Sequence, residues 1–373
     1  MSRQRIAIMC NGVVPDSNIP CGAQGLRARG TQLGLQAHGY DVDIITKSNV
    51  PHVQAKRWGV SNIRVPGYWR LIQPENFVRT VNRCYDVLIL PNWAALPDFV
   101  PRKDTKLIYD FFSATLVEHS FITDEEGLNK RRESKIELLS NASNFIGNGI
   151  GRAEYGTKFL NEVGLGNHDV ASVRLTAQGL PRSVDKAGGF RIFAGGFDQP
   201  WTQGLTPEVL FEVADSVRAE IVTIGVGKNP NMDKAPLAFD SLSQNRQGIG
   251  RVLGHPPQVS KGYNTLNASS HVTLDVFMRN AEREVSYSTR AVSALSNGCP
   301  LITMSFTEIG QIVKELDCGW VLDEFSIEAL IDLLREIESD RDEVERRAAN
   351  TLLFRERYGD PVTEAQGLVD FLT

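Results

Sequence analysis

The sequence predicts an α/β protein built from two halves, each containing a parallel sheet. Short apolar strands alternate with helical segments along all 373 residues, the pattern of parallel sheets covered by helices. A polar, glycine-containing stretch, Leu180–Gly189, interrupts the alternation near the middle, and the pattern then starts again. Two domains of ordinary size are also what a chain of this length predicts.

The first half begins with a β-loop-α-β unit. Ile6–Cys10 is a short apolar strand, a polar loop rich in Gly and Pro follows, and a helix then ends at His38-Gly39. Tyr40–Thr46 is the next strand, so the pair is expected to be parallel. Further strands are expected at Ile63–Val65, Asp86–Leu90, Lys106–Asp110 and Asn144–Gly147, with helices at Asp124–Leu139 and Arg152–Val163 and a last segment at Ala171–Leu175.

The second half repeats this organisation after the interruption. Its expected strands are Phe190–Ala194, Glu220–Gly227, Gly250–Gly254, Val272–Val276, Leu301–Met304 and Trp320–Leu322. One long helix is expected from Ser326, a suitable N-cap, to about Leu353. A final helix is expected at Val362–Leu372.

The segment from Ser286 to Ile302 is the most informative in the chain. Val292 and Leu295 fall at helical spacing, and Asn297-Gly298 is a helix stop, because glycine accepts the left-handed conformation. The helix begins in a polar stretch that carries Ser286, Ser288, Thr289 and Arg290. Unpaired N–H groups at a helix start favour an anion, and hydroxyls with an arginine suit a phosphate.

Composition excludes several classes of protein. The net charge of -5 gives no reason to expect binding to nucleic acid. No apolar run approaches a membrane span and the N-terminus lacks a signal-peptide core, so a cytoplasmic protein is expected, with peripheral membrane contact left open. The five cysteines are scattered without a metal-binding spacing, so neither zinc nor any other metal or resident cofactor is expected.

Several motifs, taken together and in order, resemble the GT-B glycosyltransferases, and among them the retaining bacterial enzymes of family four. The resemblance rests on Gly22-Ala23-Gln24-Gly25, on Leu175–Pro181 before the second half, on Ala194–Phe197 with Gln203-Gly204, on Ser293–Pro300, and on Glu308 followed by Gly319–Leu322. It covers nearly the whole chain. It implies two Rossmann-like domains with a cleft between them: an acceptor-binding domain at 1–183, a nucleotide-sugar-binding domain at 184–355, and a C-terminal helix at 356–373 crossing back to the first domain.

The resemblance also implies where the donor binds. Gly22, Gly25, Gly195, Gly196, Gln203, Glu282, Glu284, Ser286, Ser288, Thr289, Arg290 and Ser293 are the expected donor-binding residues. The chain departs from the family at three places: Ser293 stands where a ribose-binding glutamate is usual, and Phe197 and Gln203 replace the arginine and lysine that clamp the diphosphate. Arg290 is the expected substitute, because its planar fork matches phosphate oxygens.

The implied reaction is metal-independent transfer of a sugar from a nucleoside-diphosphate sugar to a hydroxyl of a glycan, a lipid-linked or a small-molecule acceptor. The diphosphate must be stabilised as it leaves, and the acceptor hydroxyl must lose its proton. Asp110 ends a strand, where clefts of parallel sheets open. Asp110 and His119 are therefore the candidate catalytic residues, although Asp110 also suits a turn and His119 an ordinary helix surface.

Three other functions remain open. A degenerate protein that serves as a non-catalytic partner of an active transferase is favoured by the missing ribose glutamate and the missing Arg/Lys pair. A nucleotide-sugar epimerase needs more carboxylates and histidines than the motifs supply. A nicotinamide-dependent dehydrogenase is disfavoured, because the first βα turn lacks the G-x-G-x-x-G fingerprint.

Overall fold

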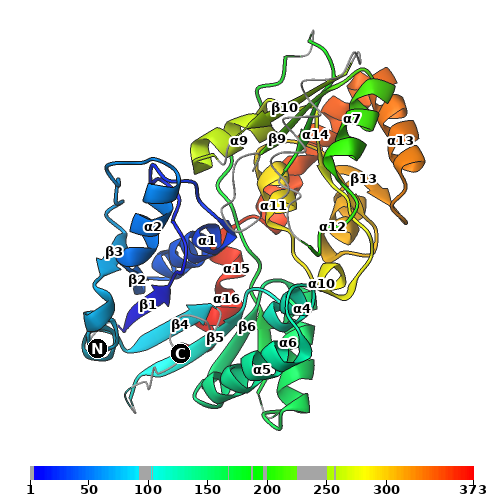
Figure 1. Ribbon diagram of the computed structural model, residues 1–373. Coiled ribbons are helices and arrows are strands. Elements are labelled where there is room, and N and C mark those ends of the chain that lie inside the picture. Colours follow the sequence, from blue (N-terminus) through cyan, green and yellow to red (C-terminus); the bar gives the residue numbers. More distant parts are fainter. Residues whose placement is uncertain are drawn as a thin grey trace. The chain divides into compact units, whose positions relative to one another are not determined.

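The computed structural model describes residues 4–91, 102, 104–166, 168–185, 188–195, 200–224, 250–255 and 258–373. The described residues divide into two compact units (Figure 1). Unit 1 takes the chain up to Ala177 together with Val285–Tyr287 and Tyr358–Thr373. Unit 2 takes Gln178–Glu284 and Ser288–Arg357. The division at residues 183 and 355 expected from the resemblance stays a prediction.

Unit 1 contains a seven-stranded sheet in the order β3-β2-β1-β4-β5-β6-β7, and every pairing is parallel. Alternate residues of its strands enter two separate apolar cores, one under α1 and the other under α3, α5 and α6. Both faces of the sheet are therefore covered, as parallel sheets require. The strands are β1 (Arg5–Met9), β2 (Asp41–Lys47), β3 (Trp69–Ile72), β4 (Val87–Pro91), β5 (Lys106–Phe111), β6 (Asn144–Gly147) and β7 (Val170–Ser172).

The helices of unit 1 follow these strands along the chain. They are α1 (Ala23–Ala37), α2 (Asn49–Arg57), the short 3₁₀ helix η1 (Pro74–Asn76), α3 (Phe77–Cys84), α4 (Thr115–Ser120), α5 (Glu125–Ser140) and α6 (Ile150–Glu162). The expected strand at Ile63–Val65 is wrong, because these residues lie in an irregular segment where Val65 stays 43% exposed. The edge strand forms at β3 instead, where Trp69 is buried and donates its Nε1–H to Thr46 Oγ1 at 2.7 Å.

The C-terminal segment returns to unit 1, as expected. It forms two short helices, α15 (Pro361–Glu364) and α16 (Gln366–Val369), in place of the single helix expected there. Of the two red helices in Figure 1, α15 lies beside α1, and α16 contacts β7. A Cβ on Gly34 of α1 would meet the carbonyl oxygen of Pro361 at 2.2 Å, so the close approach requires glycine. Glu364 accepts the backbone N–H of Arg174 at 2.9 Å and anchors the segment.

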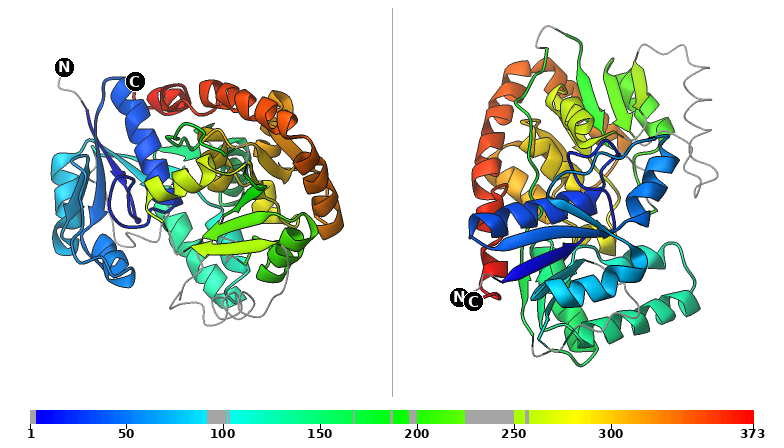
Figure 2. Two further views of the ribbon diagram at one scale, coloured as in Figure 1. Left: turned by 90° about the horizontal axis from the view of Figure 1, so that it is seen from above. Right: turned by 90° about the vertical axis from the view of Figure 1, so that its left-hand side faces the viewer.

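Unit 2 contains a six-stranded parallel sheet in the order β10-β9-β8-β11-β12-β13. Its strands are β8 (Arg191–Ala194), β9 (Glu220–Ile224), β10 (Arg251–His255), β11 (Val272–Asp275), β12 (Leu301–Met304) and β13 (Gly319–Leu322). Its helices are α7 (Pro207–Ser216), α9 (Ser260–Ala268), α10 (Ala281–Glu284), α11 (Thr289–Ser296), α12 (Glu308–Leu316), α13 (Ile327–Ser339) and α14 (Arg341–Arg357). The principal core lies under α7 and α13. Both helices can be followed in Figure 2, where α7 is green and α13 is orange.

The helix-turn-strand expected between Ser286 and Ile302 is confirmed. Ser288 is the N-cap of α11, and its hydroxyl accepts the N–H of Ala291. The chain leaves the helix through Gly298 at φ 75°, a left-handed conformation that favours glycine, and then enters β12. The start of the helix at Thr289 places Ser286 outside it.

The single helix expected from Ser326 to Leu353 is wrong, because the chain breaks at Asp340. That residue leaves the helical conformation (φ -125°, ψ 81°), and its carboxylate accepts the N–H of Glu343 at 3.0 Å, the contact of an N-cap. The start of α13 is as expected, since Ser326 accepts the N–H of Ala329 at 3.0 Å. The residue that ends the helix is Asp340, which lies within a continuous stretch of helical spacing in the sequence.

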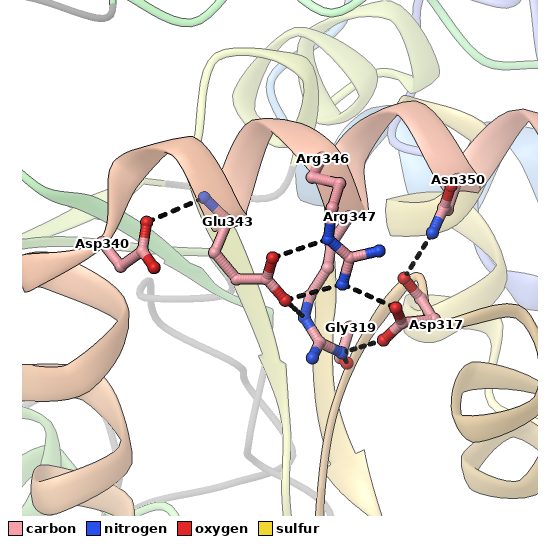
Figure 3. Close-up of polar contacts among 7 residues, drawn as sticks. All are labelled: Asp317, Gly319, Asp340, Glu343, Arg346, Arg347 and Asn350. Atoms are coloured by element: carbon pink, nitrogen blue, oxygen red, sulfur yellow. Dashed lines mark hydrogen bonds and ion pairs between the residues drawn. The ribbon is translucent and has the colours of Figure 1, made fainter.

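A network of ions fixes α14 to the turn that precedes β13 (Figure 3). Asp317, at φ 50°, pairs with both Arg346 and Arg347 at 2.6 Å. The two arginines also pair with Glu343. The pKa of the Glu343 carboxyl is lowered to about 2, and the main cause is the hydrogen bond from Arg346. Asn350 donates to the carbonyl oxygen of Asp317 at 3.0 Å. The network therefore joins α12, β13 and α14.

Candidate functional site

The strand order of unit 2 has a switch point at the carboxyl ends of β8 and β11. These neighbours are the strands at which the chain order reverses, since β9 and β10 lie on one side and β12 and β13 on the other. Ligands of open α/β sheets bind at such a switch point. Gly195 follows β8 directly and Asp275 is the last residue of β11.

An ion pair occupies this position. Arg290, in the first turn of α11, directs its Nε to Asp275 Oδ1 at 2.9 Å. The Asp275 side chain is fully buried, whereas that of Arg290 is 17% exposed. A guanidinium carries five N–H donors in a planar fork, so it can contact a carboxylate and phosphate oxygens at the same time. Asp275 thus orients the arginine that the sequence assigned to the diphosphate.

Gly195 leaves room for the Arg290 side chain. A Cβ at residue 195 would lie 2.7 Å from Arg290 Cδ and 3.5 Å from Tyr263 Oη. Because the guanidinium is held by Asp275, the Cδ atom cannot move aside without disturbing the ion pair. Tyr263 comes from α9, packs edge-on against Phe193 at 5.3 Å, and has its pKa raised to about 12 by burial. The tyrosine therefore stays a neutral donor or acceptor beside the arginine.

The hydroxyls predicted around Arg290 differ in their positions. Ser288 caps α11, and Thr289 is in its first turn, where backbone N–H groups have no partner within a helix. Ser293 is 1% exposed, one turn further along the helix. Ser286 belongs to Val285–Tyr287, the short segment that groups with unit 1. The structure therefore brings Gly195, Arg290, Ser288 and Thr289 to one end of unit 2 and assigns Ser286 to the other unit.

The two predicted glutamates have different environments. Glu282, in α10, is 1% exposed and forms an ion pair with its neighbour Arg283. Burial lowers the pKa of Arg283, and its guanidinium lies 5.0 Å from the centroid of the Phe277 ring. Glu284 is at the surface and accepts from Arg279 Nε at 2.6 Å. Donor contact by either glutamate stays a prediction.

Gln203 lies beside the exit of β11, because its carbonyl oxygen accepts the N–H of Met278 at 2.6 Å. Its side chain is exposed. Gly196 and Phe197, the other predicted members of this loop, lie outside the described residues. Gln203 is thus at the correct end of the sheet for donor binding, without the charge of the usual lysine.

The predicted catalytic residues lie in unit 1. Asp110, near the end of β5, is 3% exposed, and both of its carboxylate oxygens accept from Arg27 of α1, at 2.9 and 3.1 Å. His119, in α4, is partly buried, and its pKa is lowered first by burial and then by Arg131, so the ring is neutral at pH 7. Catalysis by either residue stays a prediction, and Asp110 already has a partner in the folded chain.

The glycines predicted near the start of α1 have separate roles. Gly22 is the N-cap residue, and an added Cβ there would meet no atom within 4 Å. A Cβ on Gly25 would lie 1.9 Å from the carbonyl oxygen of Val13, so the loop after β1 can cross the helix only at a glycine. Gly25 therefore has a packing role, and donor contact by either glycine stays a prediction.

Sequence reasoning missed Asp275 and Tyr263. Asp275 ends a buried strand, which is the same feature on which the prediction for Asp110 rests. Tyr263 lies on α9, and nothing in its neighbourhood along the chain points to Gly195. Among the described residues, no group of three or more His, Cys, Asp and Glu side chains could hold a metal ion, and no helix is long and apolar enough to cross a membrane.

Comparisons with known proteins give structural neighbours only, since no protein-family model and no curated protein matches the sequence. Sucrose-phosphate synthase from Thermosynechococcus elongatus has a TM-score of 0.71 at 16% identity, over 99% of this chain and 98% of that chain. HepE from Anabaena, solved with UDP-glucose, has a TM-score of 0.67 at 13% identity over 99% of each chain. An alpha-glucosyltransferase solved with UDP-glucose and DNA has a TM-score of 0.67 at 10% identity over 100% of each chain.

These likenesses establish the fold. The two parallel sheets are those of the GT-B architecture, two Rossmann-like domains in one chain, which confirms the expected fold class. The match extends over whole chains on both sides, so both halves take part in it. At identities of 10–16% the activities of the neighbours do not pass to this chain by likeness alone.

Proposed function

We propose that the protein is a glycosyltransferase that moves a sugar from a nucleoside-diphosphate sugar to an acceptor hydroxyl without a metal ion. The observation that carries the proposal is the Gly195–Arg290–Asp275 arrangement at the switch point of unit 2. Sequence motifs selected Gly195 and Arg290 separately, 95 positions apart, and the fold brings them into contact. Structural neighbours solved with UDP-glucose support the choice of donor class.

The residues of this site suit the departure of a diphosphate. When the bond between the sugar C1 and the phosphate oxygen breaks, its electron pair stays on that oxygen and negative charge builds on the diphosphate. The Arg290 guanidinium and the backbone N–H groups that open α11 are positive groups fixed in advance at one point. Such preorganised groups stabilise a developing anion more than water does, because they need no reorganisation. Asp275 keeps the arginine in place.

We assign acceptor binding to unit 1. The acceptor is a hydroxyl of a glycan, a lipid-linked saccharide or a small molecule, and the proton it loses is assigned to Asp110 or His119. Nucleic acid is not proposed as the acceptor, because the chain carries a net charge of -5, although one structural neighbour was solved with DNA. All five cysteines are free thiols, which suits the reducing cytoplasm.

A second candidate is a non-catalytic GT-B protein that supports an active transferase. It is favoured by the charge balance at the switch point, where Arg290 and Arg283 face the carboxylates of Asp275 and Glu282. Four charges that sum to zero attract a diphosphate less strongly than two unopposed cations. Turnover by the purified chain separates the two candidates.

The test is release of nucleoside diphosphate from a panel of UDP-, GDP-, ADP- and dTDP-sugars, with monosaccharide, glycan, lipid-linked and DNA acceptors. We expect wild type to consume one donor type and EDTA to leave the rate unchanged. Gly195→Val is expected to lower kcat/KM by about 10–100-fold, because the added methyl groups displace Arg290. Gly67→Ala is the matched control, since an added Cβ at residue 67 meets no atom within 4 Å.

Two outcomes would contradict the proposal. Equal kcat/KM in wild type and Gly195→Val would mean that the switch point of unit 2 does not hold the donor. Nucleotide binding without consumption of any donor would select the non-catalytic candidate. A transfer to DNA would keep the reaction and replace the acceptor class.

A further inference from the structure

A cavity lies at the amino-terminal edge of the sheet of unit 2, the end opposite to Gly195 and Asp275. Its volume is about 450 Å³, within the range of small-molecule sites. It is lined by the first residues of three strands, Arg191 of β8, Glu220 of β9 and Arg251 of β10. Arg218, which precedes β9, and His271, which precedes β11, complete its polar lining.

The strand register sets the three charges in a row. Arg251 is paired in register with Glu220, and Glu220 with Arg191. Side chains in register on parallel strands point to the same face and are about 4.8 Å apart from strand to strand. Glu220 pairs with Arg191 at 3.2 Å. Among the described residues neither Arg251 nor Arg218 forms an ion pair, although Glu220 is the neighbour of Arg251 in the sheet, so both guanidinium groups can contact an anion.

The backbone at Arg218 is an independent sign of function. Arg218 follows the C-cap of α7 and has φ 49°, the left-handed conformation that helices commonly assign to glycine at this position. A residue with a Cβ is strained there by on the order of 1 kcal/mol. Glycine would remove the strain and the guanidinium together. A strained arginine that lines a cavity is the kind of outlier that accompanies binding sites.

His271 adds a neutral donor. Its side chain is 4% exposed, and its Nδ1 accepts the backbone N–H of Arg191 at 3.0 Å, so the ring proton is on Nε2. Burial, and after it the nearby charges of Arg341 and Arg182, lower the pKa of His271 to about 4. The imidazole is therefore uncharged at pH 7, and its Nε2–H can donate a hydrogen bond to an anion.

We infer that this cavity binds a phosphate dianion, either free or carried by a small polyol. The Arg218 and Arg251 guanidinium groups match phosphate oxygens in shape and charge. The Glu220 and Asp185 carboxylates and the Ser269 hydroxyl, which also line the cavity, are acceptors and donors suited to the hydroxyls of a polyol. Because the cavity and the switch point lie at opposite ends of the sheet, this binding does not depend on the proposed transferase activity.

The experiment is calorimetric titration of the full chain with inorganic phosphate and with glycerol 3-phosphate, at constant ionic strength set by sodium chloride. We expect saturable 1:1 binding in wild type and about tenfold weaker binding in both Arg218→Gly and Arg251→Gln, the loss of one charged hydrogen bond. Tighter binding of glycerol 3-phosphate than of phosphate identifies the polyol ester as the ligand. Equal affinities identify the free ion.

Arg218→Gly keeps the test decisive, because glycine suits the left-handed backbone and the variant is expected to melt at or above the wild-type temperature. Arg335→Gln, an exposed arginine on α13, is the matched control for loss of one positive charge and should bind like wild type. Absence of saturable binding by wild type, or the same affinity in wild type, Arg218→Gly and Arg251→Gln, would overturn the inference.

Discussion

Replacing Arg27 by methionine is expected to lower the free energy of unfolding by about 3–5 kcal/mol, because the substitution leaves a buried carboxylate without its cation. Arg27 and Asp110 are 2% and 3% exposed, and the guanidinium reaches both carboxylate oxygens. Asp110→Leu alone is expected to have an effect of similar size, since it leaves the arginine unpaired. Urea unfolding of the four proteins of this double-mutant cycle measures both effects.

The double variant Arg27→Met/Asp110→Leu gives the sharper test. Replacing a buried ion pair by apolar side chains is often neutral, so the double variant should recover most of the stability that either single variant loses. The control is Lys130→Met on α5, which removes an exposed pair with Glu126 and should change stability by about 0.5 kcal/mol or less. Additive losses in the double variant would contradict this account.

The same double variant tests the catalytic prediction for Asp110. If it folds and retains donor turnover, Asp110 is a partner of Arg27 and not a base. If it folds and loses turnover while still binding nucleotide, the carboxylate takes part in the reaction.

Replacing Lys135 by methionine is expected to raise the free energy of unfolding at pH 7 by on the order of 4 kcal/mol. Lys135 lies on α5 with its side chain fully buried, and its Nζ donates no hydrogen bond among the described residues. The ammonium is surrounded by the rings of Tyr109, Phe111, Tyr155 and Phe159, at 4.9–5.9 Å from their centroids. Burial lowers its pKa to about 7, from 10.5 in an exposed lysine.

The pH dependence has a definite sign. Between pH 7 and 10.5 the unfolded chain holds a proton on Lys135 that the folded chain has lost, so wild-type stability rises with pH in this window. The gain from Lys135→Met should therefore be largest near pH 7 and should shrink toward pH 10.5. Urea unfolding midpoints of wild type and Lys135→Met at pH 7, 9 and 10.5 measure this difference in stability.

Lys158→Met, an exposed lysine on α6, is the matched control and should show neither the gain nor the pH dependence. A difference in the free energy of unfolding between wild type and Lys135→Met that stays constant from pH 7 to 10.5 would contradict a lowered pKa of Lys135. A loss of stability at pH 7 would mean that the aromatic cage stabilises the ammonium by more than its burial costs.

Local patterns predicted most elements of the fold. Strands such as Lys106–Phe111 and Leu301–Met304 are apolar runs bounded by polar residues, and the stop at Gly298 follows from glycine alone. The wrong predictions lie where a side chain caps the backbone of the next helix, or where an apolar segment does not join the sheet. Asp340 breaks a helix by capping the next one, and Ile63–Val65 has strand composition but stays irregular, and the edge strand forms at β3.

The site was predictable only in part. Gly195 and Arg290 follow from motif positions, but their contact, and the role of Asp275 in holding the arginine, depend on strand order. Likewise, the pairing of Arg27 with Asp110 spans 83 positions, so no local pattern indicates it. Lys135 belongs to the helix expected at Asp124–Leu139, and only the aromatic residues from β5 and α6 show that this lysine is buried.

Hydrogen–deuterium exchange with and without UDP, GDP, ADP or dTDP is the measurement that tests the central claim most directly. The claim is that a nucleoside diphosphate binds at the switch point of unit 2. We expect the nucleotide that binds to slow exchange at the amides of Gly195, which follows β8, and of Thr289 and Arg290, which lie in the first turn of α11. Protection confined to unit 1 or to the amino-terminal edge around Arg191 and His271, with Gly195 and Arg290 unchanged, would contradict the claim.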